Sequence, residues 1–146
     1  MINLSSKQLG TITEYECAIA IMKEGCRVSI PLGENSPYDL IADIGNKLYK
    51  IQCKHSRPVS GGFEFSCECT RINATSIKVV HYEDSEVDYF ATMFNNTCYL
   101  VPKTLCGSVC KLRAEPTKNN QAASINWADR FDAHAVISTI LESTNQ

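Results

Sequence analysis

Two apolar runs separated by Gly45-Asn46 constrain the fold of this chain more than any other feature. The segment SPYDLIADIGNKLYKIQCKHSR (36–57) carries strand-forming residues on both sides of this dipeptide. Gly-Asn between two such runs favours the tight turn of a β-hairpin. We therefore predict two antiparallel strands, over about 38–44 and 48–54.

The turn also fixes which residues of the two strands face each other. With Ile44 paired roughly with Lys47, Asp39 lies roughly opposite Gln52, where paired Cβ atoms are about 5 Å apart. Alternation along the second strand puts Lys54 on the same face as Gln52. The hairpin by itself therefore brings an aspartate, a glutamine and a lysine to one place.

Periodicity and turn residues predict the remaining elements. A helix is expected over about 5–24, with an inward stripe that combines Leu9, Ile12, Ala18, Ile19, Ile21 and Met22, and Gly25 would end it in a left-handed conformation. A second helix is expected over 127–142, with Asn126 as N-cap. Strands are expected at 26–30, 63–71, 87–94, 97–102 and 109–113, with 77–82 either strand or loop. This order indicates one α+β or mixed α/β domain over 1–146.

Composition limits the class of protein. The formal net charge is −2, which argues mildly against nonspecific nucleic-acid binding. No apolar run approaches 18 residues and no secretory h-region is visible, so we expect no membrane contact and a reducing intracellular location, in the cytoplasm or nucleoid. The eight cysteines are then expected as thiols. The Cys106/Cys110 pair lacks the partners of a zinc site, so small buried side chains are the favoured role.

One carboxylate of the first helix joins the polar residues of the hairpin. Glu14 is followed by Ala18 and Ile21, so it is expected on the inward face, where a carboxylate is costly unless it is paired or binds a metal. Together with Asp39 and the amide oxygen of Gln52 it would supply hard oxygen ligands of the kind that Mg²⁺ takes. Divalent-metal-assisted phosphodiester hydrolysis is the chemistry that such a group can perform.

The residues Glu14, Pro37-Tyr38-Asp39 and Gln52-Cys53-Lys54 resemble the motif of the PD-(D/E)xK nuclease superfamily. With the segments EYECAIAIMKEGCRVSIPLGENSPYDLIA, LYKIQCKHSR and KLRAEPTKNNQ, the chain is most similar to the small homing endonucleases associated with group I introns. The sequence departs from the motif in two ways, because Tyr38 separates the proline from the aspartate and Gln52 stands where Asp or Glu is usual.

This resemblance implies a fold, a cofactor and roles for individual residues. The fold would have an α-β-β-β-α-β core with a central mixed sheet flanked by helices. Glu14, Asp39 and Gln52 would bind Mg²⁺, with Mn²⁺ as a substitute, and Lys54 would be the catalytic lysine. The reaction would be site-specific cleavage of double-stranded DNA. Because one chain carries one site, cutting both strands suggests a homo-oligomer, either a dimer or a tetramer.

Basic and amide side chains elsewhere are candidates for DNA contact. Lysine and arginine suit phosphates, and asparagine suits base edges. The candidates are Lys50, Arg57, Arg71, Lys111, Arg113, Lys118, Asn119 and Asn120.

Three other interpretations stay open. The chain could be a catalytically inactive DNA-binding protein of the same fold, since Gln52 removes one negative charge from the metal site. It could be a nuclease of restriction or repair type, because one fold serves many functions. It could also be an interaction protein in which the acidic stretch 82–89 matters more than the basic segments, with each polar residue an ordinary solvated side chain.

Overall fold

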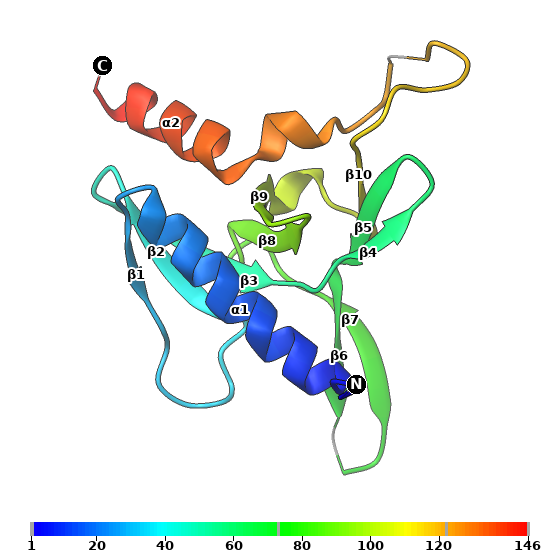
Figure 1. Ribbon diagram of the computed structural model, residues 1–146. Helices are drawn as coiled ribbons and strands as arrows, with labels where there is room; N and C mark the ends of the chain where they lie inside the picture. The colour runs from blue at the N-terminus through cyan, green and yellow to red at the C-terminus, as the bar shows by residue number, and fades with distance from the viewer. Residues whose placement is uncertain (1, 73, 122, 146) are drawn as a thin grey trace.

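The computed structural model describes residues 2–72, 74–121 and 123–145, without the side chains of Arg71 and Ile72. Two α-helices, ten strands and two short 3₁₀ helices are formed within these ranges (Figure 1). In chain order they are α1 (Ser6–Lys23), β1 (Arg27–Ser29), β2 (Leu40–Ile44), β3 (Lys47–Cys53), β4 (Arg57–Val59), β5 (Gly62–Ser66), β6 (Glu68–Ile72), β7 (Ile77–His81), β8 (Tyr89–Phe94), β9 (Thr97–Pro102), η1 (Lys103–Leu105), β10 (Val109–Arg113), η2 (Ala128–Phe131) and α2 (Ala133–Thr144).

The first helix begins and ends where the sequence predicts. Ser5 and Gln8 form a capping box, in which the Ser5 hydroxyl accepts from the Gln8 N–H (3.3 Å) and Gln8 Oε1 accepts from the Ser5 N–H (2.8 Å). Both bonds satisfy N–H groups that a helix start leaves unpaired. The helix is followed by Gly25, whose φ of 85° is the expected left-handed conformation.

The inward face of α1 differs from the predicted stripe. The buried residues are Thr13, Cys17, Ala18 and Ile21. Ile12, Ile19 and Met22 are exposed instead, with 40%, 52% and 57% of their surface accessible. The prediction that these three pack inward is therefore wrong, because α1 carries apolar residues on two opposite faces and only one of them covers the sheet.

A five-stranded mixed sheet forms the centre of the molecule, in the order β1-β2-β3-β8-β9. β3 and β8 run parallel, and the other neighbours are antiparallel. The predicted hairpin is confirmed: Gly45 and Asn46 have positive φ (59° and 64°), and Ile44 pairs with Lys47. Both φ values suit the turn that matches the natural twist of two strands. The predicted fold class, a mixed α+β domain with a central mixed sheet, is confirmed.

The connection from β3 to β8 carries no helix among its described residues. The α-β-β-β-α-β order places a helix there, but the chain instead forms β4 to β7, and the second α-helix follows β10 and η2. A parallel pair needs a long crossover, which is usually helical. Here the crossover has alternating apolar residues, which suit strands. It forms β4 and β5, which join β10 in a three-stranded sheet, and the separate pair β6-β7.

The single strand predicted over 63–71 is wrong. It divides at Cys67, whose backbone N–H donates to the Ser108 carbonyl (2.9 Å). The part before Cys67 pairs with β10 and the part after it pairs with β7. The period-two pattern runs across this division, so the pattern alone could not reveal it.

The C-terminal helix starts later than predicted. A 3₁₀ turn precedes it, and α2 begins at Ala133 rather than at Trp127. Its N-cap is Asp132, not Asn126, because the Asp132 carboxylate accepts from the N–H of His134 (2.9 Å) and of Ala135 (3.4 Å). A cap is defined by these bonds to the first turn, and Asp132 makes them.

Two clusters of buried side chains form the core. One lies between the central sheet and the two helices and includes Cys17, Ile21, Ile51 and Ile137. The other lies under β5 and β10 and includes Phe63, Phe90 and Cys110. No helix in the described part of the chain is long and apolar enough to span a membrane.

The central strand β3 allows a direct test of the first cluster. Ile51 is fully buried, whereas Leu48 in the same strand is 63% exposed. We expect Ile51→Ala to lower the free energy of unfolding by about 2–5 kcal/mol, because the sheet cannot close over the cavity it leaves. Leu48→Ala should change it by less than about 0.5 kcal/mol. Urea denaturation measures both, and equal losses would contradict the packing described here.

Candidate active site

Asp39 lies at the point where the chain enters β2. Its backbone N–H donates to the Ile51 carbonyl (2.9 Å), which continues the β2–β3 ladder by one residue. Its carboxylate oxygen Oδ2 accepts from the Cys53 N–H (2.8 Å). Asp39 is therefore fixed from the backbone of both strands, opposite Gln52, as the hairpin register predicts.

Lys54 directly follows β3, and its ammonium group is held close to the sheet. The Lys54 N–H donates to the Ala91 carbonyl of β8 (2.8 Å), and its Nζ donates to the Glu68 carbonyl (2.7 Å). The same Nζ lies 5.0 Å from the centre of the Tyr82 ring, a distance at which a cation is attracted to the ring face. Burial lowers the pKa of Lys54, and the negative charges of nearby groups, including Asp39, oppose that shift.

The two carboxylates of the site are close enough to affect each other. Burial raises the pKa of Glu14, and the charge of Asp39 raises it further. Burial also raises the pKa of Asp39, while the Cys53 N–H and the Lys54 ammonium favour its ionised form. Glu14 of α1 therefore lies close enough to Asp39 of the hairpin for the two charges to interact.

Gln52 completes the group on the face that the alternation of β3 predicts. Its position pairs with Phe90 of the parallel strand β8. Its amide Nε2 donates to the Cys53 carbonyl (3.3 Å), so its carbonyl oxygen is the atom available to a ligand. The side chain is half-buried and lines a cavity that Asp39 also lines.

This cavity has a volume of about 530 Å³ and lies over the polar face of the hairpin. Besides Asp39 and Gln52 it is lined by Glu34, Asn35, Ser36, Pro37, Cys69, Thr70, Tyr82 and Glu86. Sequence reasoning missed Tyr82 and the Glu68 carbonyl, which position Lys54. No local pattern marks them, because they come from the crossover between β3 and β8.

The chemistry of these donors fits a divalent metal ion. Two half-buried carboxylates repel each other across the site, and a divalent cation between them would remove that repulsion. Among the described residues, no group of three or more His, Cys, Asp or Glu side chains could hold a metal ion. The third protein ligand would therefore be neutral, and the amide oxygen of Gln52 is in place to supply it.

Two of the predicted DNA-contacting residues are engaged within the protein. The Lys50 ammonium donates to the Ser85 carbonyl. Arg57 forms an ion pair with Glu64 (2.6 Å). The side chain of Arg71 lies outside the described residues.

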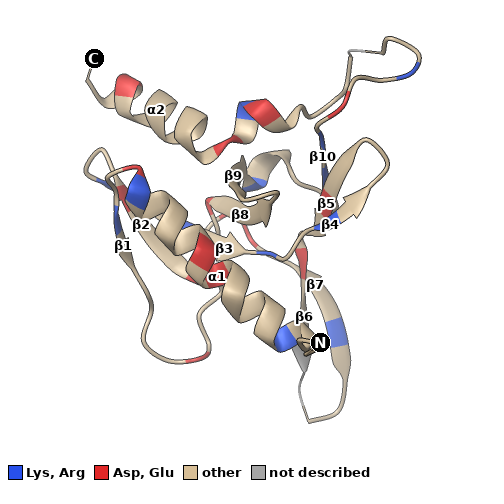
Figure 2. Ribbon diagram, viewed as in Figure 1, with Lys and Arg blue, Asp and Glu red and all other residues tan. Residues whose placement is uncertain are grey.

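The other predicted DNA contacts lie on β10 and the loop after it. Lys111 is exposed, and Arg113 donates to the carbonyls of Glu115 (2.7 Å) and Pro116 (3.0 Å). The rest are the exposed residues Lys118, Asn119 and Asn120. These five do not line the Asp39 cavity, and Figure 2 shows Lys and Arg spread over several elements rather than gathered at one.

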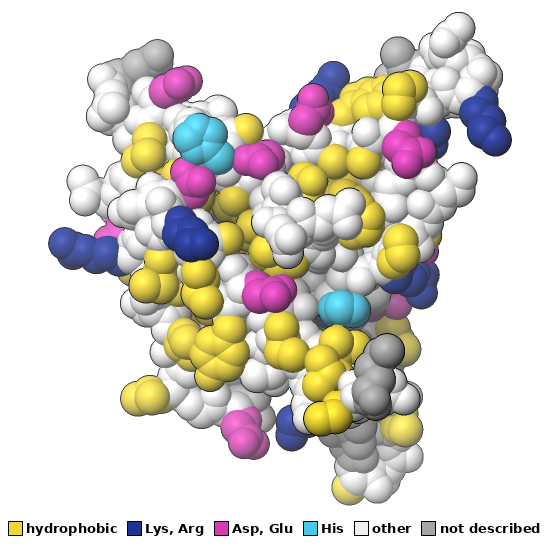
Figure 3. All heavy atoms as spheres, viewed as in Figure 1, with side chains coloured by type: hydrophobic (Ala, Val, Ile, Leu, Met, Phe, Trp, Pro, Cys, Tyr) yellow, Lys and Arg dark blue, Asp and Glu magenta, His cyan; other side chains and the backbone are white. Residues whose placement is uncertain are grey.

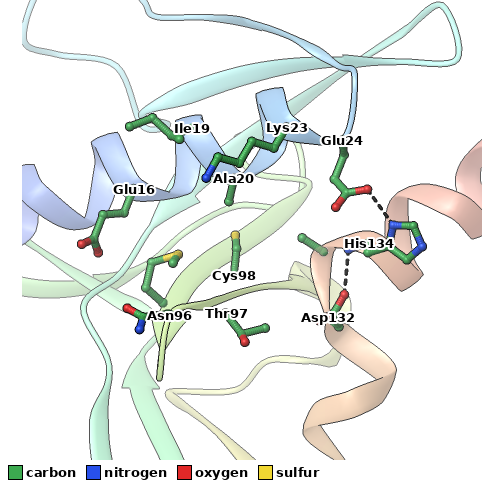
Figure 4. Close-up of a pocket in the computed structure, with 12 residues that line it drawn as sticks. Glu16, Ile19, Ala20, Lys23, Glu24, Asn96, Thr97, Cys98, Asp132 and His134 are labelled. Atoms are coloured by element: carbon green, nitrogen blue, oxygen red, sulfur yellow. Dashed lines mark hydrogen bonds and ion pairs between the residues drawn. The ribbon is translucent and has the colours of Figure 1, made fainter.

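A second cavity, of about 430 Å³, lies between α1, the β8–β9 turn and the start of α2 (Figure 4). His134 Nδ1 and Glu24 Oε2 are 2.7 Å apart at its edge, and this contact raises the pKa of His134. The pair joins the ends of the two helices. None of the four candidate site residues lines this cavity.

Comparison with known proteins gives one family and one related fold. A family model described as PD-(D/E)XK endonuclease matches residues 4–134. Among solved structures, the chain is similar to the bacterial homing endonuclease I-Ssp6803I, with a TM-score of 0.76 and 22% identity over 97% of both chains. At that identity the likeness shows a shared fold. No curated protein matches the chain.

The raised pKa of Glu14 predicts that its ionised carboxylate lowers the stability of the metal-free protein, although the same carboxylate would strengthen metal binding. A carboxyl with a higher pKa in the folded chain binds more protons when folded, so stability falls as pH rises from its ordinary pKa through the raised one. At a pH above that interval, we expect Glu14→Gln to raise Tm by about 1–3 °C without metal. It should also weaken Mg²⁺ binding by roughly tenfold or more, since it removes a charged ligand.

Thermal unfolding with and without MgCl₂, together with titration calorimetry, measures both effects. The matched control is Glu16→Gln, because Glu16 is an exposed acid of the same helix and should change neither quantity. A lower Tm for Glu14→Gln, with an unaltered Mg²⁺-induced shift, would contradict the assignment.

Proposed function

Because the chain belongs to the PD-(D/E)XK endonuclease family, we propose that it is a metal-dependent endonuclease that cuts double-stranded DNA at specific sites. The observation that carries this proposal is that Asp39 and Gln52 line one cavity of the central sheet, with Glu14 and Lys54 close enough to Asp39 for their charges to interact. Mg²⁺ is the proposed ion, with Mn²⁺ as a substitute. The resemblance to intron-associated enzymes, and the fold shared with a homing endonuclease, support a homing role.

The roles of the carboxylates and of Gln52 follow from their positions. Glu14, Asp39 and the Gln52 amide oxygen would hold the ion. A bound Mg²⁺ would lower the pKa of a water molecule and stabilise negative charge on the scissile phosphate. The Cys53 N–H keeps the Asp39 carboxylate oriented, so that one of its oxygens is held by the backbone while the other stays available to a ligand.

We assign Lys54 a role on the nucleophile or on the phosphate. The Glu68 carbonyl and the Tyr82 ring hold its ammonium group beside Asp39. A positive charge in a half-buried site interacts with a phosphate more strongly than one in water. Lys54 can therefore position the attacking water and stabilise charge that develops in the transition state.

The outer face of α1 supports the proposal of a homo-oligomer. Ile12, Tyr15, Ile19 and Met22 follow one another at intervals of three, four and three residues, and all are at least 40% exposed. This spacing is that of a helix–helix seam, and Figure 3 shows hydrophobic side chains along the line of α1. A second copy presents the same stripe, so two antiparallel α1 helices would bury both, and the pair would carry the two sites that cutting both strands requires.

Gln52 favours one alternative function. A neutral ligand in place of a carboxylate weakens the attraction for a cation, so a DNA-binding protein that does not cut is the second candidate. It would bind DNA with the salt dependence of phosphate contacts and leave the DNA intact with any metal.

Substitution of Lys54 tests the proposed chemistry. We expect Lys54→Ala to lower the cleavage rate by about 10²–10³-fold, the usual effect of removing a group that stabilises transition-state charge. Purified protein would be incubated with plasmids and with its own locus, any intron removed, in Mg²⁺, Mn²⁺ or EDTA. Lys47→Ala is the control, because Lys47 is an exposed lysine at the tip of the same hairpin.

Two results would contradict this proposal. Cleavage that persists in EDTA would contradict the metal dependence, and cleavage that persists in Lys54→Ala would contradict the catalytic role of Lys54. DNA binding without cleavage by the native chain would favour the second candidate, and absence of both would overturn the function altogether.

Oligomerisation can be tested separately on α1. Ile19→Glu places a charge in the middle of the stripe, and burying an unpaired charge is costly. We expect the native chain to sediment as a dimer or larger and Ile19→Glu to shift towards the monomer at micromolar concentration. Leu48→Glu, at another exposed apolar residue, should not shift. A native monomer, with and without DNA, would count against the oligomer.

A further inference from the structure

β6 and β7 form a two-stranded ribbon that stands apart from both larger sheets. Within the described residues, these two strands pair only with each other, from Glu68↔His81 to Ile72↔Ile77. Figure 1 shows them projecting together from the body of the molecule. Isolated two-stranded hairpins are marginally stable in water. The ribbon therefore gains little stability from its own two strands.

The base of the ribbon is attached to the candidate active site. The Glu68 carbonyl accepts from Lys54 Nζ (2.7 Å), and Tyr82, directly after β7, is buried under the same ammonium group. Cys69 and Thr70 line the cavity that Asp39 and Gln52 line. A phosphate bound at this cavity would therefore lie beside the first residues of the ribbon.

The exposed surface of the ribbon carries short and β-branched side chains. Thr70 pairs with Val79 across the two strands, and both are exposed. Ile77 is 73% exposed and Val79 59% exposed, on the same face of β7 by alternation. Lys78, between them, is exposed on the other face. Methyl groups and hydroxyls are the side-chain groups that contact thymine methyls and base edges.

We propose that the β6–β7 ribbon enters the major groove of the DNA beside the scissile phosphate and reads its sequence, an inference that rests on the proposed nuclease function. Five residues per strand extend about 17 Å, and the groove is about 12 Å wide and 8.5 Å deep, enough to admit a two-stranded ribbon. Thr70 and Val79 contact base edges, Ile77 lies deeper along the same face, and Lys78 reaches a phosphate at the groove wall.

Cleavage of a randomised duplex library tests whether the ribbon recognises the DNA sequence. The native chain, Thr70→Ala and Val79→Ala would be incubated with the library, and the cut products sequenced. We expect both variants to cut at the same position but to discriminate about tenfold less among the base pairs next to the cut. Val79→Ala removes two methyl groups from the contact, and Thr70→Ala removes one methyl group and one hydroxyl. Leu48→Ala, at an exposed apolar strand residue far along the hairpin, should keep the native preference.

Salt dependence provides a second readout, independent of cleavage. Lys78→Ala should reduce the slope of log affinity against log salt by about one, the effect of losing one phosphate contact. Lys47→Ala should leave the slope unchanged. Guanine N7 lies in the major groove, so methylation of guanines beside the cut should weaken binding of the native chain.

The outcomes separate the ribbon from the nuclease. Native cleavage with unchanged preferences in Thr70→Ala and Val79→Ala would overturn the ribbon assignment and leave the nuclease standing, as would an unchanged salt slope in Lys78→Ala. A native chain that neither cuts nor binds the library would overturn the proposed function and the ribbon with it. Because all three side chains are exposed, thermal unfolding should show variants as stable as the native chain, within a few degrees.

Discussion

The hydrogen bond from the Cys53 N–H to the Asp39 carboxylate belongs both to the central sheet and to the candidate active site. It crosses the β2–β3 hairpin where the ladder ends, so the register that begins at Gly45-Asn46 is completed by a side chain. A hydrogen bond to a charged group contributes about 1.5–3 kcal/mol. The same bond orients a carboxylate beside Gln52 and Lys54, so the fold and the site share one interaction.

Burial sets the electrostatic character of this site. The pKa values of Glu14 and Asp39 are raised and the pKa of Lys54 is lowered. Burial is the largest cause of all three shifts. The protein alone thus disfavours the charged forms that a metal ion and a phosphate would favour. The surrounding packed sheet offsets the stability that these partly buried charged groups remove.

Two of the exposed apolar surfaces among the described residues bear on the proposed function. The outer stripe of α1 and the exposed face of β7 each carry large side chains that the fold leaves in water. They differ in shape: a helix face suits a second helix, and a narrow ribbon suits a groove. The proposed DNA contact of the ribbon rests on its position beside Lys54, and the proposed pairing of two chains rests on the spacing of exposed apolar residues on α1.

Local sequence determined the elements whose signals are short-range. The capped start of α1, the hairpin turn at Gly45-Asn46 and the pairing of Asp39 with Gln52 all follow from a few adjacent residues. Only tertiary structure decided which face of α1 is inside, where the strand breaks at Cys67, and that Glu68 and Tyr82 hold Lys54. The physical reason is that periodicity records which residues can be buried together, whereas the partner that buries them comes from a distant part of the chain.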